Sequence, residues 1–156
     1  RDHAELSALV LSQVDLPDPV EAALAGERVY RGVITAGDII REWQLQADLV
    51  TLSACETGLG RRIHGEGLVG LAHAFLQAGA RSLLVSLWNV DDEETALLME
   101  RFYRIRYGGG PEPRPRKADA LRAAKKWLRE HRDARGRRPF AHPYYWSSVV
   151  LFGDPS

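Results

Sequence analysis

The sequence predicts an α/β fold built in layers around a mostly parallel sheet, because strand patterns alternate with helix patterns along the chain. Two continuous apolar runs, at 48–53 and 81–87, are typical of strands that are covered on both faces. Between them, residues 66–78 repeat apolar side chains at helical spacing, and Gly79 follows where a C-terminal glycine cap belongs.

Capping signals predict where two further helices begin. Thr35 followed by Asp38, and Asp91 followed by Glu94, both have the spacing of a capping box. The helices expected are 35 to about 43, 91 to about 107 and 117–131, and the remaining expected elements are strands at 7–12, 29–33 and 146–152 and a loop at 16–27.

The composition is that of a globular protein. We expect the 156 residues, 45% hydrophobic and 27% charged, to form one domain over 1–156. The 21 basic and 21 acidic residues cancel, which gives no reason to expect nucleic acid or a membrane as a partner. No apolar run approaches the roughly 18 residues of a membrane-spanning helix. Only three of the 21 basic residues are lysine, which we interpret as the mark of a GC-rich, bacterial genome.

Cys55 is the single cysteine, so no internal disulfide can form and a cytoplasmic, reducing compartment is permitted. It lies two residues beyond the strand at 48–53, and ligands of open α/β sheets bind beyond the carboxyl ends of strands. This position can give a thiol nucleophile access and a backbone N–H, but it does not provide a base. A small buried core cysteine would fit the same position.

The segment around Cys55 resembles a known motif. Leu-Ser-Ala-Cys-Glu-Thr-Gly at 52–58 closely resembles the nucleophile motif of CHAT domains, which are caspase-like peptidases often found beside tetratricopeptide repeats. The resemblance continues in order through nearly the whole chain. The segments that share it are 6–11, 35–39, 65–67, 74–75, 78–81, 86–92, 142–146 and 153–154.

The resemblance implies a three-layer caspase-like fold and cysteine endopeptidase activity on a protein or peptide substrate. Cys55 would be the nucleophile, and its N–H would be part of the oxyanion hole. Ser86 to Trp88 would line the substrate cleft. Asp91 and Asp92 are candidates for selecting a basic substrate side chain, although each is also a good helix cap. A tetratricopeptide-type or other regulatory domain is the expected partner in the parent protein.

The base is the missing part of this site. In the family it is a histidine followed by glycine, at the end of a strand before the segment matched by 6–11. Here His3 is followed by alanine. We therefore expect the base, and one or more N-terminal strands, to precede Arg1, and this segment alone to be inactive. The alternative is a peptidase-like scaffold without activity that binds other proteins.

The other histidines have simpler interpretations. His64 lies in a loop after the nucleophile, where it could approach Cys55 but is expected to be solvated. His73 is flanked by apolar helix positions and suits either packing or a helix surface, and His131 suits a helix end. His142 opens the C-terminal motif and is interpreted as structural, ordering Tyr144 and Trp146.

Cofactor and metal signals are weak. Residues 65–70 match G-x-G-x-x-G, but the preceding strand ends about a dozen residues earlier, and Glu66 would oppose a pyrophosphate. One cysteine and scattered histidines do not make a zinc site, so we expect neither cofactor nor metal.

The arginines within 132–138 are interpreted as a solvated turn, with docking of an acidic partner as the alternative. The aromatic residues at 144–146 lack the interleaved basic residues of a nucleic-acid platform.

Overall fold

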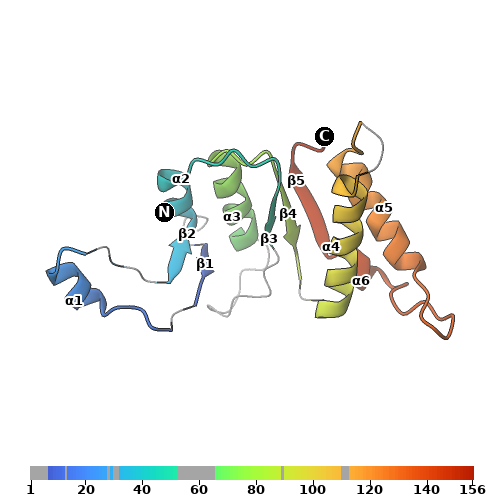
Figure 1. Cartoon of the computed structure of the whole chain (residues 1–156), viewed down its shortest axis with the longest axis horizontal. Helices are drawn as coiled ribbons and strands as arrows, with labels where there is room; N and C mark the ends of the chain where they lie inside the picture. Colours follow the sequence, from blue (N-terminus) through green and yellow to red (C-terminus); the bar gives the residue numbers. More distant parts are fainter. Residues whose placement is uncertain are drawn as a thin grey trace. The chain divides into compact units, whose positions relative to one another are not determined.

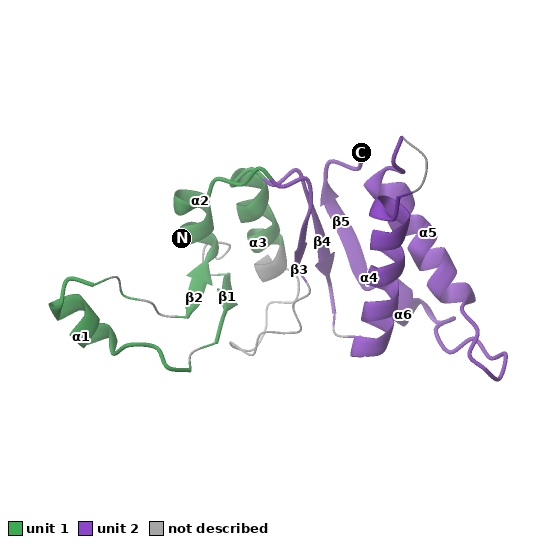
Figure 2. Ribbon diagram, in the orientation of Figure 1, with its two compact units in different colours: residues 1–46, 57–79 green, residues 47–56, 80–156 purple. Residues whose placement is uncertain are grey.

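The computed structural model describes residues 7–12, 14–27, 29, 32–52, 66–88, 90–109 and 113–156, with the backbone alone for 66–68. The chain forms two compact units, residues 1–46 with 57–79 and residues 47–56 with 80–156 (Figure 2). Both units combine helices with strands, which confirms the mixed α/β class. None of the helices in the described ranges has the length and hydropathy that crossing a bilayer requires.

The first unit pairs a two-stranded sheet with helices. β1 and β2 are antiparallel, with Ala8 opposite Thr35. α2 packs on α3, where Trp43 meets Phe75 edge to face at 5.7 Å between ring centroids. The elements of this unit are β1 (Ala8–Val10), α1 (Pro19–Leu24), β2 (Val33–Thr35), α2 (Ala36–Glu42) and α3 (Glu66–Gln77).

The capping box that the sequence predicts at Thr35 is present. The Thr35 hydroxyl accepts a hydrogen bond from the Asp38 N–H at 3.1 Å, and the Asp38 carboxylate accepts one from the Thr35 N–H at 2.9 Å. The hydrogen bonds from Thr35 hold the pKa of Asp38 below its usual value. The start of α2 is therefore fixed by the two residues that predicted it.

Two expectations for this unit were wrong. The segment 16–27 is not all loop, because Asp18 caps α1 by accepting from the Val20 and Glu21 N–H groups, and Pro19 supplies a preset φ at the first helical position. Residues 30 and 31 of the strand expected at 29–33 lie outside the described residues, and the strand described in this region, β2, begins only after Gly32. Gly32 has φ of 63°, a left-handed conformation that a strand does not continue through.

The second unit holds a three-stranded sheet in the order β3-β4-β5. β3 runs parallel to β4, with Leu52 opposite Val85, and β5 runs antiparallel to β4, with Val149 opposite Ser86. The elements of this unit are β3 (Val50–Leu52), β4 (Ser82–Ser86), α4 (Asp92–Tyr107), α5 (Lys117–Glu130), α6 (Pro143–Trp146) and β5 (Val149–Gly153).

The core of this unit lies between the sheet and the two long helices. It is formed by apolar side chains that are at least nine-tenths buried, contributed by β4, α4, α5, β5 and the segment before α6. These are Leu84, Leu98, Phe102, Ala120, Leu121, Ala124, Leu128, Phe140 and Val149. In β4 the residues Ser82 to Val85 are all buried, as expected of a strand covered on both faces, whereas every residue of β3 is half-buried.

The expectation of a mostly parallel sheet was wrong for the described strands, since only one of their three pairings is parallel. A single helix after β4 would return the chain to the start of that strand. Two helices, α4 and α5, follow instead and pack side by side (Figure 1). The chain therefore comes back to the edge where β4 ends, and β5 must run antiparallel. α6 also occupies 143–146, so the last strand begins later than expected.

The first prediction concerns Gly79, which has φ of +107° and lies against the Leu45 carbonyl. A Cβ there would meet the Leu45 oxygen at 2.2 Å. We expect Gly79→Ala to lower the free energy of unfolding by at least about 2 kcal/mol, through the backbone clash as well as the strained φ. Urea unfolding followed by circular dichroism and tryptophan fluorescence measures it.

Gly26→Ala is the matched control, because Gly26 has φ of +71° and open space where a Cβ would be. This variant keeps the strained φ without the clash and should lose about 1 kcal/mol. Equal losses for the two variants would contradict the close approach at Leu45.

Candidate functional site

The candidate site is the sheet edge at which β3 and β4 end. Because the two strands are parallel, the segments that follow Leu52 and Ser86 leave the sheet at the same edge. Cys55 follows β3 by three residues, but residues 53–65 lie outside the described residues, and so does His3. The described part of the site is therefore the segment after β4 and its neighbours in the same unit.

The segment after β4 is held by hydrogen bonds on one side. The Ser86 hydroxyl donates to the Trp88 carbonyl at 3.1 Å, which bends the chain as it leaves the strand. The Leu87 N–H donates to the Ser148 carbonyl at 2.8 Å, which ties the bend to the chain just before β5. The Leu87 side chain is 45% exposed. The strand end thus has a fixed backbone and an accessible apolar side chain.

The half-buried Trp88 and the exposed Tyr144 form an aromatic pair at this edge. The Trp88 indole N–H donates to the Tyr144 carbonyl at 3.0 Å, and the two rings stack with centroids 6.3 Å apart. His142 caps α6, because its Nδ1 accepts from the Tyr144 N–H at 3.2 Å. The sequence-based role of His142 in ordering Tyr144 is confirmed. The pair combines a flat apolar surface with polar groups that are already bonded.

Asp91 does not cap α4 with its side chain as the sequence predicts. Asp91 stands at the N-cap position of α4, but its side chain makes no cap hydrogen bond, so the expected capping box with Glu94 was wrong. Asp91 and Asp92 are both exposed. These carboxylates are therefore available to solvent at the start of α4.

Sequence reasoning missed the burial of Glu94. This residue is only 7% exposed, and its Oε2 has no hydrogen-bond partner within the described residues. Its position on the buried face of α4 explains the failed cap, because Glu94, Leu98 and Phe102 follow each other at intervals of four. That spacing was the available signal.

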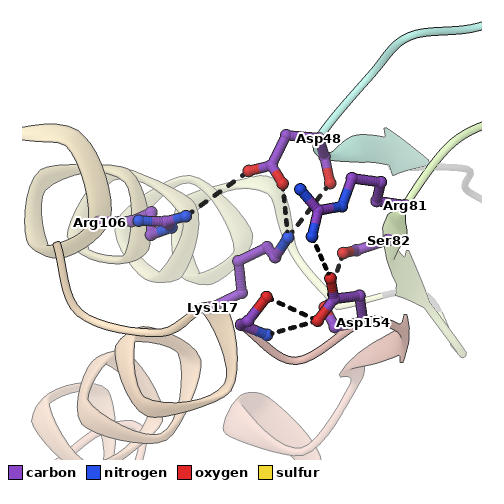
Figure 3. A network of polar contacts seen from close by, with 7 residues as sticks. Asp48, Arg81, Ser82, Arg106, Lys117 and Asp154 are labelled. Carbon is purple, nitrogen blue, oxygen red and sulfur yellow. Dashed lines mark hydrogen bonds and ion pairs between the residues drawn. The ribbon is translucent and has the colours of Figure 1, made fainter.

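At the opposite edge of the sheet, a buried lysine fixes the start of β3. The Lys117 side chain is 1% exposed, and its ammonium donates to the Asp48 carboxylate at 2.7 Å (Figure 3). Arg106 on α4 lies 3.6 Å from the other Asp48 oxygen. The hydrogen bond from Lys117 and then the charges of Lys117 and Arg106 hold the pKa of Asp48 below its usual value, against the desolvation that raises it.

A second cluster at this edge joins β4 to β5. Arg81 donates to the Asp154 carboxylate at 2.6 Å, and the Ser82 hydroxyl donates to the Asp154 carbonyl at 2.7 Å. The Ser156 hydroxyl and N–H also donate to Asp154, and these bonds with that of Arg81 hold the pKa of Asp154 far below its usual range. The two clusters fix all three strands at the edge away from the candidate site.

The second prediction follows from the unequal burial of Lys117 and Asp48. Asp48→Ala leaves a buried ammonium without its carboxylate, so we expect a loss of about 3 kcal/mol in the free energy of unfolding. Lys117→Met removes the charge and keeps an unbranched stem of similar length, while the half-exposed Asp48 stays hydrated. We expect that variant to lose about 1 kcal/mol or less. Urea unfolding at neutral pH measures both.

The same pair has a pH signature. The folded pKa of Asp48 is lowered, so its contribution to stability is present above the ordinary carboxyl pKa and is lost as the pH falls through the folded value. Below about pH 4 the stability of Lys117→Met should therefore fall less steeply than that of the unchanged chain. Asp119→Asn, which alters a half-buried carboxylate paired with the exposed Arg116 and Arg122, is the control for pairing with exposed cations. Equal losses for Asp48→Ala and Asp119→Asn would contradict this account.

Comparison with known proteins gives the family. The model of the CHAT domain matches residues 1–154. Tetratricopeptide repeat protein 28 of Mus musculus is 30% identical over 122 residues, and that of Homo sapiens is 27% identical over 122 residues, in each case 78% of this chain. The match spans 4% of the length of each relative. Both relatives are mammalian, so the bacterial source stays a prediction. The chain belongs to the CHAT domain family.

Proposed function

We propose that this chain supplies the nucleophile and the substrate-cleft strand of a caspase-like cysteine endopeptidase, with Cys55 as the nucleophile. The observation that carries the proposal is the family match over residues 1–154, which includes the Cys55 motif directly after β3. The three-layer caspase-like arrangement, one domain over 1–156 and a reducing, cytoplasmic location belong to the same proposal. The curated relatives are tetratricopeptide repeat proteins by name, and we extend the proposal to a regulatory domain of that kind.

The sheet geometry supports a cleft at this edge. β3 and β4 end together, so a loop carrying a nucleophile after β3 and a substrate-binding segment after β4 would face the same volume. The exposed Leu87 and the half-buried Trp88 offer apolar surface beside a backbone that is held in place from one side. Asp91 makes no cap hydrogen bond, and we propose that Asp91 and Asp92 attract a basic side chain of the substrate.

The proposed chemistry is acyl transfer. The Cys55 thiolate attacks the scissile carbonyl carbon, a C–S bond forms, and the Cys55 N–H stabilises the oxyanion. A histidine takes the thiol proton and passes it to the leaving amine as the C–N bond breaks. Water then hydrolyses the thioester and restores the thiol. The substrate is a protein or peptide, and no step needs a metal or a cofactor.

We propose that the histidine base precedes Arg1, because the described histidines have other roles. His131 stacks on Phe140 at 5.8 Å and lies against Trp127 at 5.1 Å. His142 caps α6, and His73 is exposed on α3. The two histidines outside the described residues are tested by the experiment on thiol reactivity below.

The third prediction is that Cys55→Ala in the full-length protein abolishes peptide-bond cleavage and leaves folding intact. New protein N-termini are labelled and identified by mass spectrometry after incubation with a protein extract, and circular dichroism checks the fold. Cys55→Ser is the conservative control and should also be inactive, because a serine hydroxyl beside the same base is a far weaker nucleophile than a thiolate. Undiminished cleavage by Cys55→Ala would rule out the proposed nucleophile, and absence of cleavage by the unchanged protein would favour the scaffold.

The fourth prediction concerns the reactivity of the thiol. Because the chain has one cysteine, its alkylation by iodoacetamide gives a single mass shift. We expect the rate in this chain to rise with a midpoint near the ordinary thiol pKa of about 8.5, and at lower pH in the full-length protein. A low midpoint in this chain that returns to the ordinary value in His3→Gln or His64→Gln would place the base within the chain and contradict the proposed upstream base.

A further inference from the structure

One face of the second unit carries a groove that the proposed peptidase chemistry does not use. It is a hollow of about 460 Å³ formed by α5, the last residue of α6 and strand β5. Four cationic side chains of α5 line it, and its apolar lining, here called the floor, includes Trp146 and Leu151. The cations are Arg122, Lys125, Lys126 and Arg129.

The charges of this groove are not balanced by carboxylates within its lining. Arg122 and Arg129 make ion pairs with Asp119 and Glu130, each at 3.1 Å, but neither acid is among the residues that line the hollow. Lys125 is half-buried and makes no ion pair within the described residues, and burial lowers its pKa. A carboxylate that entered the groove would therefore relieve an uncompensated, partly desolvated charge.

The floor of the groove suits a large apolar side chain. Trp146 is half-buried, and its indole N–H donates to the Ala141 carbonyl at 3.3 Å, so its ring is held in place and its polar atom is occupied. Leu151 is half-buried on β5, and Leu121 of α5 also contributes. A fixed aromatic and two leucines leave apolar surface that only an apolar side chain covers well.

We propose that this groove docks an acidic peptide segment of a partner protein, with one large apolar side chain seated on Trp146 and Leu151 and carboxylates against the cations of α5. A peptide fits better than a nucleic acid, because the cations are confined to one helix around an apolar floor and the whole chain has zero formal charge. It also fits better than a membrane, which would need a broad exposed apolar face.

The probe is the synthetic peptide Asp-Glu-Asp-Glu-Trp-Glu-Asp-Glu-Asp, titrated into the full chain by isothermal calorimetry. One comparison peptide has serine in place of the tryptophan, and a second has asparagine and glutamine in place of every acid. We expect each comparison peptide to bind at least about tenfold more weakly than the probe. Raising the salt concentration from about 50 to about 300 mM should also weaken binding of the probe, because salt screens interactions between charges.

The test variant is Lys125→Glu combined with Lys126→Glu, and its control is Arg135→Glu combined with Arg138→Glu. The control makes the same change in net charge in the exposed turn after α5, outside the groove. We expect the test variant to lose at least about tenfold in affinity and the control about twofold or less. Thermal unfolding shows whether the change at the half-buried Lys125 perturbs folding. If it does, the peptide affinity of Lys126→Glu alone, at an exposed position, tests the proposal instead.

Three outcomes would overturn the proposal. Equal losses in the test and control variants would reduce the effect to net charge. Binding of a thymidine 12-mer or of phosphatidylserine vesicles that the test variant abolishes, without binding of the probe peptide, would assign the groove to another kind of polyanion. Loss of peptide binding in Cys55→Ala would assign the peptide to the proposed peptidase cleft, whereas unchanged binding in that variant would separate the groove from the proposed nucleophile.

Discussion

A buried ammonium group constrains the second unit, because once it is out of water it requires the carboxylate that compensates it. Removing the Lys117 charge from water is unfavourable, and Asp48, just before β3, offsets this. Its carboxylate accepts a hydrogen bond from the Lys117 ammonium, and its backbone carbonyl accepts a second at 3.4 Å. Arg106 brings the end of α4 to the same carboxylate. One polar cluster thus holds the start of a strand against the end of one helix and the beginning of another.

This constraint matters for the candidate site because it acts at the far end of the strands. Lys117 and Asp48 fix where β3 begins, and Arg81 with Asp154 fixes β4 against β5. The strands are short and regular, so fixing one end sets where the other end lies. Catalytic and binding residues commonly occupy loops that a rigid scaffold positions. Here the scaffold is the three-stranded sheet, and the segment from Leu87 to Trp88 is the part of the loop edge that carries its own hydrogen bonds.

Local signals predicted local structure well. Thr35 and Asp38 predicted a helix start because a capping box is complete within four residues, and the apolar run at 81–87 predicted the most buried strand, β4. The same spacing at Asp91 and Glu94 did not produce a capping box, because Glu94 is buried on the core-facing side of α4. The direction of β5 could not be predicted from its own residues, since it depends on the two helices that come before it. The proposed role of Cys55 rests on family resemblance, because its position in the sequence also fits a buried thiol.

Lysine is rare in this chain, and all three lysines lie on α5, at 117, 125 and 126. At the buried position 117, lysine suits the site better than arginine for a physical reason. An ammonium is a compact charge that a carboxylate and a carbonyl can satisfy, whereas a guanidinium brings five donors in a fixed plane. Arg106 illustrates the difference, because its Nε is buried without a hydrogen-bond partner among the described residues.

The same reasoning distinguishes the two lysines that are at least partly buried on α5. Lys117 has its counter-charge within the unit and therefore contributes to the fold. Lys125 is partly removed from water without such a counter-charge in the described residues, and burial lowers its pKa. A partly desolvated cation beside an apolar floor is a cost to the isolated chain, and it becomes a source of affinity when a carboxylate arrives. One helix thus uses the same residue type to stabilise the fold at its start and, on our proposal, to bind a partner further along.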